Sequence, residues 1–339
     1  MDKKDLQILR LLGENCRLNY ATIAKAINVS KDTAKNRIKA LEENKTITHY
    51  NTMVDLRPLD ISKFQLFIKL KNTAKNKEVF LEQLAKHNSF SFVNTFIGKY
   101  DLHIIVDTKD IHSFENIKKD IFETLRDQIQ DYTILTFFSD VKHCHLIPET
   151  NLEIKFKREK DSAFSSMFKE SFELEKEYLH YSPDQIDINL LKILTKNPKT
   201  SLVNLSENLR LNREAVKQRI AKLINKKIIK NFGANTSFDA FGYVTYFLLI
   251  KTNEGINDEQ LRKEFKKIKN IYYSAKTHGD YSLITYVLAK NPKELKETIK
   301  KIQETLENKI LEMEVMIFDE IKLYKQFPTN VIKELEAKA

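Results

Sequence analysis

Two short stretches of the sequence combine basic, amide and hydroxyl side chains at the spacing of one helix face. The candidate DNA-contacting residues in them are Ser30, Lys31, Thr33, Lys35, Asn36 and Arg37 in the first stretch, and Asn212, Arg213, Lys217, Gln218 and Arg219 in the second. Arg, Lys, Asn and Gln hydrogen-bond to base edges in the major groove, and hydroxyls and cations also contact phosphates. These residue types favour reversible recognition of double-stranded DNA.

A capped helix start and a preceding short helix must position each stretch. We predict Ser30 and Asn212 to be N-cap residues, because a side-chain oxygen there accepts from a free backbone N–H of the first turn. In the first stretch the shorter helix is predicted from about Tyr20 to Ile27. Two short helices joined by a tight connection are typical of a helix-turn-helix. A charged helix face alone usually belongs to solvated surface, but the capped turn and its duplication favour DNA binding.

Both stretches lie within an internal repeat. Residues 5–47 and 187–229 align without a gap at an offset of 182, and ten of the 43 aligned residues are identical. Among these identities are Asn15 with Asn197 and Arg37 with Arg219. We therefore interpret the chain as two copies of one two-domain unit.

The second domain of each copy shows an alternation of strand and helix patterns. In copy one, strands are expected at 63–70, 91–97, 102–106 and 131–141, with helices at 77–87 and along Phe114, Ile117, Ile121, Leu125 and Ile129. Copy two matches this order, with elements at 243–251, 257–269, 292–308 and 311–321. The expected fold class is α+β: two repeats of a winged helix-turn-helix followed by a ferredoxin-like βαββαβ sandwich domain.

These patterns set the expected domain boundaries. Winged helix-turn-helix domains are expected at 1–56 and 182–239, and ferredoxin-like domains for effector binding and oligomerisation at 62–147 and 242–327. Residues 148–181 form a linker in which Phe164, Phe168 and Phe172 favour an amphipathic helix. Residues 328–339 are a tail, expected to be a short helix.

Composition narrows the classes of function. The 339 residues carry a net charge of +10, which favours an anionic partner such as nucleic acid. Two cysteines cannot build a disulfide framework, so a cytoplasmic location is expected. No apolar run approaches the ~20 residues of a membrane span, so we expect no membrane partner. Neither GxGxxG nor GxxxxGK[ST] is present, and no cofactor is expected.

The chain as a whole resembles the Lrp/AsnC (leucine-responsive/asparagine-operon) family of transcription regulators. The resemblance is carried by Asp5, Ser30, Thr33 and Arg37 in copy one, by Asp184, Asp187, Asn197 and Arg219 in copy two, and by two turns. Gly98–Asp101 matches the motif Gly-x-Tyr-Asp, and Gly279–Ser282 matches it except for Ser282 at the last position, so the two halves are not expected to bind an effector equally. The resemblance implies a sequence-specific regulator that self-associates through its sheet domains. It also implies a small effector such as an amino acid near these turns, with candidate contacts Gly98, Tyr100, Asp101, His278, Gly279, Asp280 and Tyr281.

The departures from the family pattern lead to two further expectations. The family carries one unit per chain and forms dimers, so the two fused units are expected to form a pseudo-dimer. A glycine usual before the wing is replaced by Lys45 and Lys227. Because glycine favours the left-handed conformation at such a position, we expect Asn44 to close this turn in copy one. Ile228–Lys230 resemble the wing itself.

Alternative readings of the sequence remain open. Tandem chains of this fold also resemble siroheme decarboxylases, which carry His/Arg-rich stretches, but here the matching stretch 272–281 has one His and no Arg. We therefore assign no catalytic residue. His143-Cys144-His145 is more typical of a surface pair than of a metal site, since two histidines cannot close a tetrahedral site. Cys16 is expected to pack in a core. A third alternative is a protein–protein interaction module.

Overall fold

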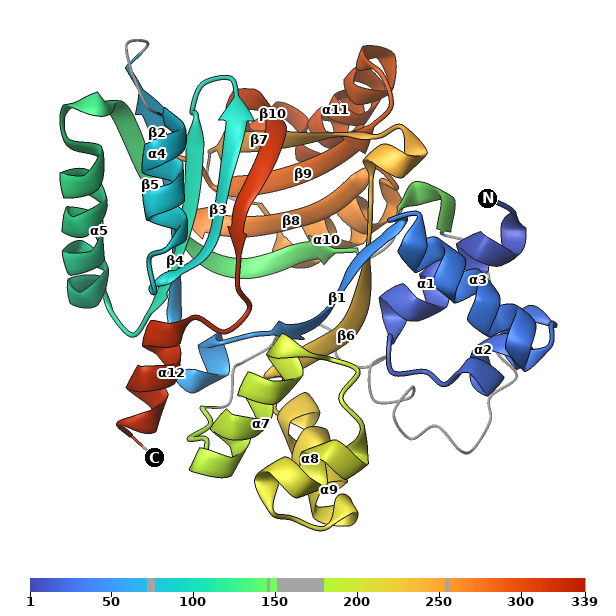
Figure 1. Cartoon of the computed structure of the whole chain (residues 1–339). Helices are drawn as coiled ribbons and strands as arrows, with labels where there is room; N and C mark the ends of the chain where they lie inside the picture. Colours follow the sequence, from blue (N-terminus) through green and yellow to red (C-terminus); the bar gives the residue numbers. More distant parts are fainter. Residues whose placement is uncertain (72–76, 145–146, 151–179, 254–255, 339) are drawn as a thin grey trace. The chain divides into compact units, whose positions relative to one another are not determined.

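The computed structural model of this mixed α/β chain describes residues 1–71, 77–144, 147–150, 180–253 and 256–338 (Figure 1). The linker helix expected around Phe164 lies outside the described residues. The chain divides into two compact units. Unit 1 comprises Met1–Asp60, His145–Ala240 and Leu335–Ala339, and unit 2 comprises Ile61–Cys144 and Phe241–Glu334. None of the described helices is long and apolar enough to cross a bilayer.

Unit 1 contains two helical trios, one from each copy. Their helices are α1 (Lys3–Glu14), α2 (Tyr20–Ile27) and α3 (Lys31–Glu43), followed by α7 (Gln185–Lys196), α8 (Leu202–Leu209) and α9 (Arg213–Asn225). All six begin at a side chain that accepts from a backbone N–H of the first turn, which offsets the lack of intrahelical partners there. The predicted caps Ser30 and Asn212 are confirmed, because they accept from the backbone N–H of Thr33 and Ala215.

A two-stranded ribbon joins the trios, and its strands come from different copies. Strand β1 (Ile47–Val54) pairs antiparallel with β6 (Ile229–Thr236), and Figure 1 shows this ribbon running between the two trios. Each trio also bonds to the strand of the other copy. The Cys16 amide donates to Phe232 O at 2.7 Å, and Thr52 Oγ1 donates to Leu194 O at 2.5 Å. The sequence did not indicate this reciprocal exchange, because strand patterning does not specify a partner strand.

The turn before each ribbon strand differs from the expectation for Asn44. Lys45 and Lys227 themselves adopt the left-handed conformation, each with φ of 58°. Asn44 keeps φ of −83°, and its side chain instead accepts from the Thr46 amide at 3.0 Å. The expectation that Asn44 closes the turn is therefore wrong: lysine takes the glycine-like position, at a cost of roughly 1–2 kcal/mol for a residue with a Cβ.

Unit 2 consists of two βαββαβ segments and most of a terminal helix. Copy one contributes β2 (Ser62–Leu70), α4 (Lys77–Ala85), β3 (Phe90–Ile97), β4 (Leu102–Thr108), α5 (Ile111–Leu125) and β5 (Ile129–His143). Copy two contributes β7 (Val244–Thr252), α10 (Asp258–Lys267), β8 (Ile271–His278), β9 (Leu283–Ala289), α11 (Pro292–Leu306) and β10 (Ile310–Tyr324), and α12 (Thr329–Glu336) follows. Ile129, which was expected in the helix, opens β5 instead, because Arg126 leaves helical geometry with φ of 46°.

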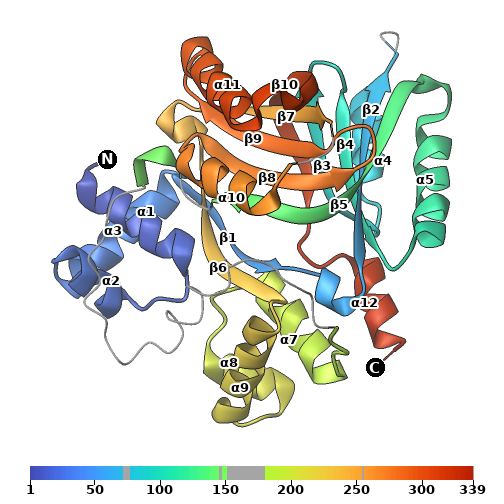
Figure 2. The same cartoon turned by 180° about the vertical axis from the view of Figure 1, so that it is seen from behind.

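The eight strands of unit 2 close into one barrel. Its order is β10-β3-β4-β2-β5-β8-β9-β7, so β5–β8 and β10–β3 are the seams between the copies. Figure 2 shows α10 and α11 outside the copy-two strands, with α5 outside the copy-one strands. The helix-facing sides form one apolar core per copy. A third core lies on the opposite face of the barrel strands and contains aromatic side chains, including Phe67, Phe96 and Phe247.

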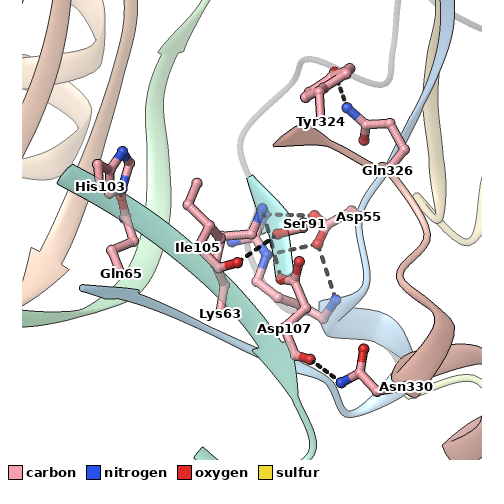
Figure 3. A network of polar contacts seen from close by, with 11 residues as sticks. Asp55, Lys63, Gln65, Ser91, His103, Ile105, Asp107, Tyr324, Gln326 and Asn330 are labelled. Carbon is pink, nitrogen blue, oxygen red and sulfur yellow. Dashed lines mark hydrogen bonds and ion pairs between the residues drawn. The ribbon is translucent and has the colours of Figure 1, made fainter. Parts of the chain in front are cut away.

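One buried polar group interrupts this third core. His103 stacks on Phe67 with 4.3 Å between ring centroids. Its Nε2 lies 3.0 Å from Gln65 Oε1 (Figure 3), and its Nδ1 lies 3.0 Å from Asn94 Oδ1. Burial lowers the pKa of His103 to about 3, so the ring is neutral. A neutral ring has a single N–H, so one amide must present its NH₂. The unpartnered Nδ2 of Asn94 makes Asn94 that amide.

The last helix is held by a carbonyl of the barrel. Asn330 Nδ2, in the first turn of α12, donates to Asp107 O at 2.8 Å (Figure 3). Val331 and Leu335 of the same helix are buried. The tail is thus a helix that is tied to β4 by this hydrogen bond.

Candidate nucleic-acid interface

The outward face of α3 presents the polar residues that the sequence singled out. Lys31, Thr33, Lys35 and Asn36 are exposed, while Ala34, Ile38 and Leu41 are buried on the opposite face. The alternation follows the helical period, so packing of the apolar stripe leaves the donors in solvent. The face is free to approach a groove.

The same separation holds in α9. Asn212, Arg213, Lys217 and Gln218 are exposed, and Val216, Ile220 and Leu223 are buried. Lys217 Nζ lies 3.3 Å from Glu214 Oε2, a surface pair one turn apart that holds the ammonium group only weakly. Each copy therefore presents one helix with donors suited to bases and phosphates.

Arg37 and Arg219 occupy a different environment from their neighbours. The Arg37 guanidinium lies 2.8 Å from Asp5 Oδ1 and 2.8 Å from Asp2 Oδ2 at the start of α1. Arg219 lies 2.7 Å from Asp187 Oδ1 and 2.8 Å from Asp184 Oδ2 at the start of α7. We call these two sets the helix clamps. Each clamp ties the third helix of its trio, α3 or α9, to the first helix. Each also pairs with carboxylates an arginine that the sequence analysis listed as a candidate DNA contact.

The sequence held a signal for the clamps that the site prediction did not use. Asp5 and Arg37 are 32 residues apart, as are Asp187 and Arg219, and all four belong to the identical positions of the repeat. An acid and a base that recur together at one spacing indicate a pair. The sequence alone could not show which of the Lys and Arg residues of each helix form ion pairs within the trio.

The two Gly-x-Tyr turns of unit 2 press against the last strand of the opposite copy. Gly98 has φ of 149° and Gly279 has φ of 135°, backbone conformations that residues with a Cβ rarely adopt. A Cβ at Gly98 would lie 2.9 Å from Met316 Cγ, and one at Gly279 would lie 2.6 Å from Ile134 O. Only glycine therefore allows these close approaches at the two seams.

The tyrosines of the turns are buried and form part of an ionic cluster. Tyr100 and Tyr281 are each 3% exposed. Lys99 Nζ donates to Tyr281 Oη at 2.7 Å, Glu312 Oε1 at 3.0 Å and Glu314 Oε1 at 3.1 Å. Burial alone would lower the pKa of Lys99, but these hydrogen bonds outweigh it and raise that pKa. Sequence reasoning did not identify Lys99, Glu312 or Glu314, because only the closed barrel brings them together.

The remaining candidate effector residues have structural partners. Asp101 accepts from the Leu70 amide at 2.8 Å, and Asp280 accepts from Thr133 Oγ1 at 2.5 Å. His278 packs against the Phe138 ring with 4.8 Å between centroids. The structure thus gathers the turn residues at the seams between the copies, where they brace the barrel.

The structure describes Cys16 and part of the His143-Cys144-His145 stretch. Cys16 is buried at 2% exposure in unit 1. His143 ends β5 and packs on Tyr273 with 5.0 Å between ring centroids, while His145 lies outside the described residues. Among the residues that the structure describes, no group of three or more His, Cys, Asp or Glu side chains is arranged to hold a metal ion.

Comparisons with known proteins agree with this geometry. The profile of the AsnC-type helix-turn-helix domain matches residues 1–42, and that of a winged helix-turn-helix DNA-binding domain matches residues 183–230. The transcriptional regulator LysM of Sulfurisphaera tokodaii is 30% identical over 120 residues, which cover 35% of this chain and 84% of LysM. An uncharacterized HTH-type transcriptional regulator of Pyrococcus abyssi is 31% identical over 144 residues, covering 42% of this chain and 96% of that protein.

The chain belongs to the Lrp/AsnC family of helix-turn-helix transcription regulators. Each of these two family relatives matches less than half of the chain, which fits one copy of the repeat. A solved structure with similarity over the full length is that of the siroheme decarboxylase NirDL, with a TM-score of 0.61, 12% identity and 99% coverage of both chains. At this identity the likeness shows a shared tandem fold alone.

Proposed function

We propose that this Lrp/AsnC-family regulator binds duplex DNA with α3 and α9 as its two recognition helices. The observation that carries the proposal is the pair of capped helices with exposed donor faces, joined within unit 1 by the β1–β6 ribbon. Helix-turn-helix proteins place such helices in major grooves about one helical turn apart. The contacts would come from Lys31, Thr33, Lys35, Asn36, Asn212, Arg213, Lys217 and Gln218.

In this proposal the helix clamps position the recognition helices. Arg37 and Arg219 are each held by two carboxylates, so their charge is already compensated. Ser30 acts through its cap. Because α3 presents Asn36 where α9 presents Gln218, the two half-sites are expected to differ at the bases these amides meet.

The sheet domains would add regulation and assembly. We propose that each βαββαβ segment is a ferredoxin-like domain, as its chain order and antiparallel pairing support. The Gly-x-Tyr turns would respond to a small effector such as an amino acid, and the sheets would mediate self-association. A role on DNA places the protein in the cytoplasm.

Selection from random duplex DNA, followed by a salt titration of the selected sites, tests the proposal. We expect an imperfect palindrome whose log affinity falls linearly with log salt. Lys35→Ala and Lys217→Ala should each reduce that slope by about 1 if the side chain meets a phosphate. Lys266→Ala, the same charge change on the exposed side of α10, is the matched control. No enriched sequence, or equal effects of all three changes, would contradict the proposal.

The siroheme decarboxylase reading rests on the full-length fold similarity to NirDL. In this chain aromatic side chains pack together in the third core of the barrel, with Phe67, Phe96 and Phe247 each at most 2% exposed. This packing favours a regulator over an enzyme that holds a tetrapyrrole there. A shift in the absorbance of added iron-uroporphyrin III would support the decarboxylase instead.

A further inference from the structure

The second residue of the two Gly-x-Tyr turns in unit 2 differs in charge. It is Lys99 in copy one and Asp280 in copy two. Both turns pack on the last strand of the opposite copy, since the glycine of one approaches β10 and that of the other approaches β5. The two positions are therefore equivalent in the fold, and any difference between them comes from the side chains.

The copy-one position holds a primary ammonium group with a full set of acceptors. Lys99 Nζ donates to Tyr281 Oη at 2.7 Å, and to Glu312 Oε1 at 3.0 Å and Glu314 Oε1 at 3.1 Å. These three acceptors match the three N–H groups of a primary ammonium. We call this arrangement the Lys99 site. The chain itself supplies its ammonium group.

Strand register identifies the matching acceptors in copy two. The starts of β5 and β10 pair with β2 and β7 in the same register, so Asp131 is the counterpart of Glu312 and Thr133 is the counterpart of Glu314. The tyrosine of the opposite turn is here Tyr100. Tyr100 and Thr133 are each 3% exposed. The equivalent site thus keeps a carboxylate, a hydroxyl and a buried tyrosine.

In copy two the turn adds a second carboxylate in place of the ammonium. Asp280 accepts from Thr133 Oγ1 at 2.5 Å. Asp131 lies two residues before Thr133 on the same face of β5, and its Oδ1 accepts from the Tyr132 amide at 2.8 Å. Burial raises the pKa of Tyr100, and the nearby Asp131 adds to that rise. Among the residues that the structure describes, no cation lies within ion-pair distance of Asp131 or Asp280.

The lysine next to this site is engaged elsewhere. Lys69 lies opposite Asp131 in the register of β2 and β5. Its Nζ is instead 3.3 Å from Asp101 Oδ2 and donates to Gly98 O at 3.2 Å. Two carboxylates therefore share the copy-two site without a counter-charge. A cation with N–H donors would form charge-assisted hydrogen bonds to both.

We propose that Asp131, Asp280 and Tyr100 bind the primary ammonium group of one small ligand per chain, at the site equivalent to the Lys99 site. Its N–H groups donate to the two carboxylates and to the tyrosine hydroxyl. Because Asp131 comes from β5 and Asp280 from the copy-two turn, the ligand bridges the copies. The Lys99 site takes no ligand, since its ammonium group is already present. An effector role for this ligand rests on the proposed function, but the binding itself does not.

A ligand-observed NMR titration of the full chain, without DNA, tests the binding. The probes are butylammonium, tetramethylammonium, which has no N–H group, and norvaline, which adds a carboxylate to the carbon that bears the nitrogen of butylammonium. We expect butylammonium to bind at least tenfold more tightly than tetramethylammonium. Norvaline that binds at least as tightly as butylammonium identifies an amino acid as the source of the ammonium, and weaker norvaline binding identifies a free amine. Tetramethylammonium binding as tight as that of butylammonium, or no saturable binding of butylammonium, overturns the proposal.

Variants locate the site. Asp131→Asn and Asp280→Asn should each weaken butylammonium binding at least tenfold. Asp120→Asn, the same charge change on α5, should leave it unchanged. All three residues are exposed, so the substitutions leave the buried cores intact. Equal effects of the three changes contradict this location.

The Lys99 site offers the converse test. Lys99→Ala removes the internal ammonium from Glu312 and Glu314 and should open a second binding site. A ligand of the folded state raises the midpoint of thermal unfolding according to its binding. Saturating butylammonium should therefore raise the midpoint of Lys99→Ala more than that of the parent chain. An equal rise in both proteins contradicts the equivalence of the two sites.

A DNA arm separates the binding from the proposed function. Affinity for the selected duplex is measured in saturating butylammonium chloride and in tetramethylammonium chloride at the same concentration, which matches the ionic strength. A difference that Asp280→Asn abolishes supports an effector role, and equal affinities contradict it. Amine binding in a protein that selects no DNA supports the site and contradicts the proposed function alone. Selection of DNA without amine binding overturns the site alone.

Discussion

The proposed recognition helices α3 and α9 share their support but differ in the face they present. Arg37 and Arg219 both reach two acidic residues at the start of the first helix of their trio. Outside these clamps, α3 presents Asn36 and α9 presents Gln218 at aligned positions. The two copies thus keep the residues that orient the helix, and among the proposed DNA contacts they keep Lys35 with Lys217 but vary Asn36 with Gln218. A residue shared by both copies is therefore a weaker guide to specificity than one that differs.

The core of the barrel also differs between the two copies at one equivalent position. In copy one His103 lies opposite Phe67 and Asn94 in the strand register. In copy two Ile284 lies opposite Leu249 and Ala275. The fold accepts both a hydrogen-bonded imidazole and an aliphatic side chain at one position. Only copy one therefore carries an ionisable group at this position of the shared core.

The largest expected effect separates the two helix clamps. Arg219→Ala should lower the free energy of unfolding by about 3 kcal/mol, because it leaves a nearly buried carboxylate without its cation. Arg37→Ala should cost only about 1 kcal/mol, since exposed pairs contribute little. The Asp187 side chain is 1% exposed, against 16% for Asp5 and 53% for Asp2. Urea unfolding of both variants measures the difference, and an equal loss would show that the clamps are equivalent.

The second effect is a dependence of stability on pH that originates in copy one. The pKa of His103 falls from the model-peptide value of about 6.5 in the unfolded chain to about 3 in the folded chain. The unfolded state then binds the extra proton between these values, so stability is retained above pH 6.5 and is lost as the pH falls. The slope should approach 1.4 kcal/mol per pH unit.

Urea unfolding at pH 7, 6 and 5 measures that slope. His103→Gln should flatten it, whatever its effect on stability at pH 7, because glutamine does not titrate. His112→Gln, at an exposed position of α5, serves as the control. A slope in His103→Gln equal to that of the parent chain would show that His103 is not its source.

The smallest effect tests a feature that the copies share. Lys45→Gly and Lys227→Gly should each stabilise the chain by about 0.5–1 kcal/mol, because relief of the left-handed strain exceeds the added entropy of glycine. Lys45→Ala and Lys227→Ala, which keep the Cβ, should bring no gain. The midpoint of thermal unfolding reports both changes. A similar rise for the alanine variants would point to removal of positive charge instead.

The sequence predicted local structure where one physical signal decides it. The caps Ser30 and Asn212 and the helix from Tyr20 to Ile27 follow from side-chain chemistry and periodicity within a few residues. The left-handed Lys45 was missed because lysine carries no preference for that conformation, and the rest of the turn imposes it. The end of α5 was missed because Ile129 continues the apolar spacing into a strand.

The contacts between the copies could not be predicted in the same way. The pairing of β1 with β6, and the approach of Lys99 to Glu312 and Glu314, join residues at least 175 positions apart. Their spacing in the sequence carries no information about which strands become neighbours. The candidate DNA-contacting residues were identified by type, and only the structure distinguished Arg37 and Arg219, which are engaged in clamps, from exposed neighbours such as Lys35.

The exchange of strands between the copies has a consequence for how binding depends on the amount of protein. Two helix-turn-helix domains on separate chains must first associate. At low protein concentration, the occupancy of a DNA site with two half-sites therefore rises with the square of that concentration. Here β1 and β6 join both helix-turn-helix domains within one chain. In the proposed mode of binding, the second domain therefore engages DNA at an effective concentration set by the ribbon. Occupancy of such a double site would then rise in direct proportion to the concentration of the chain.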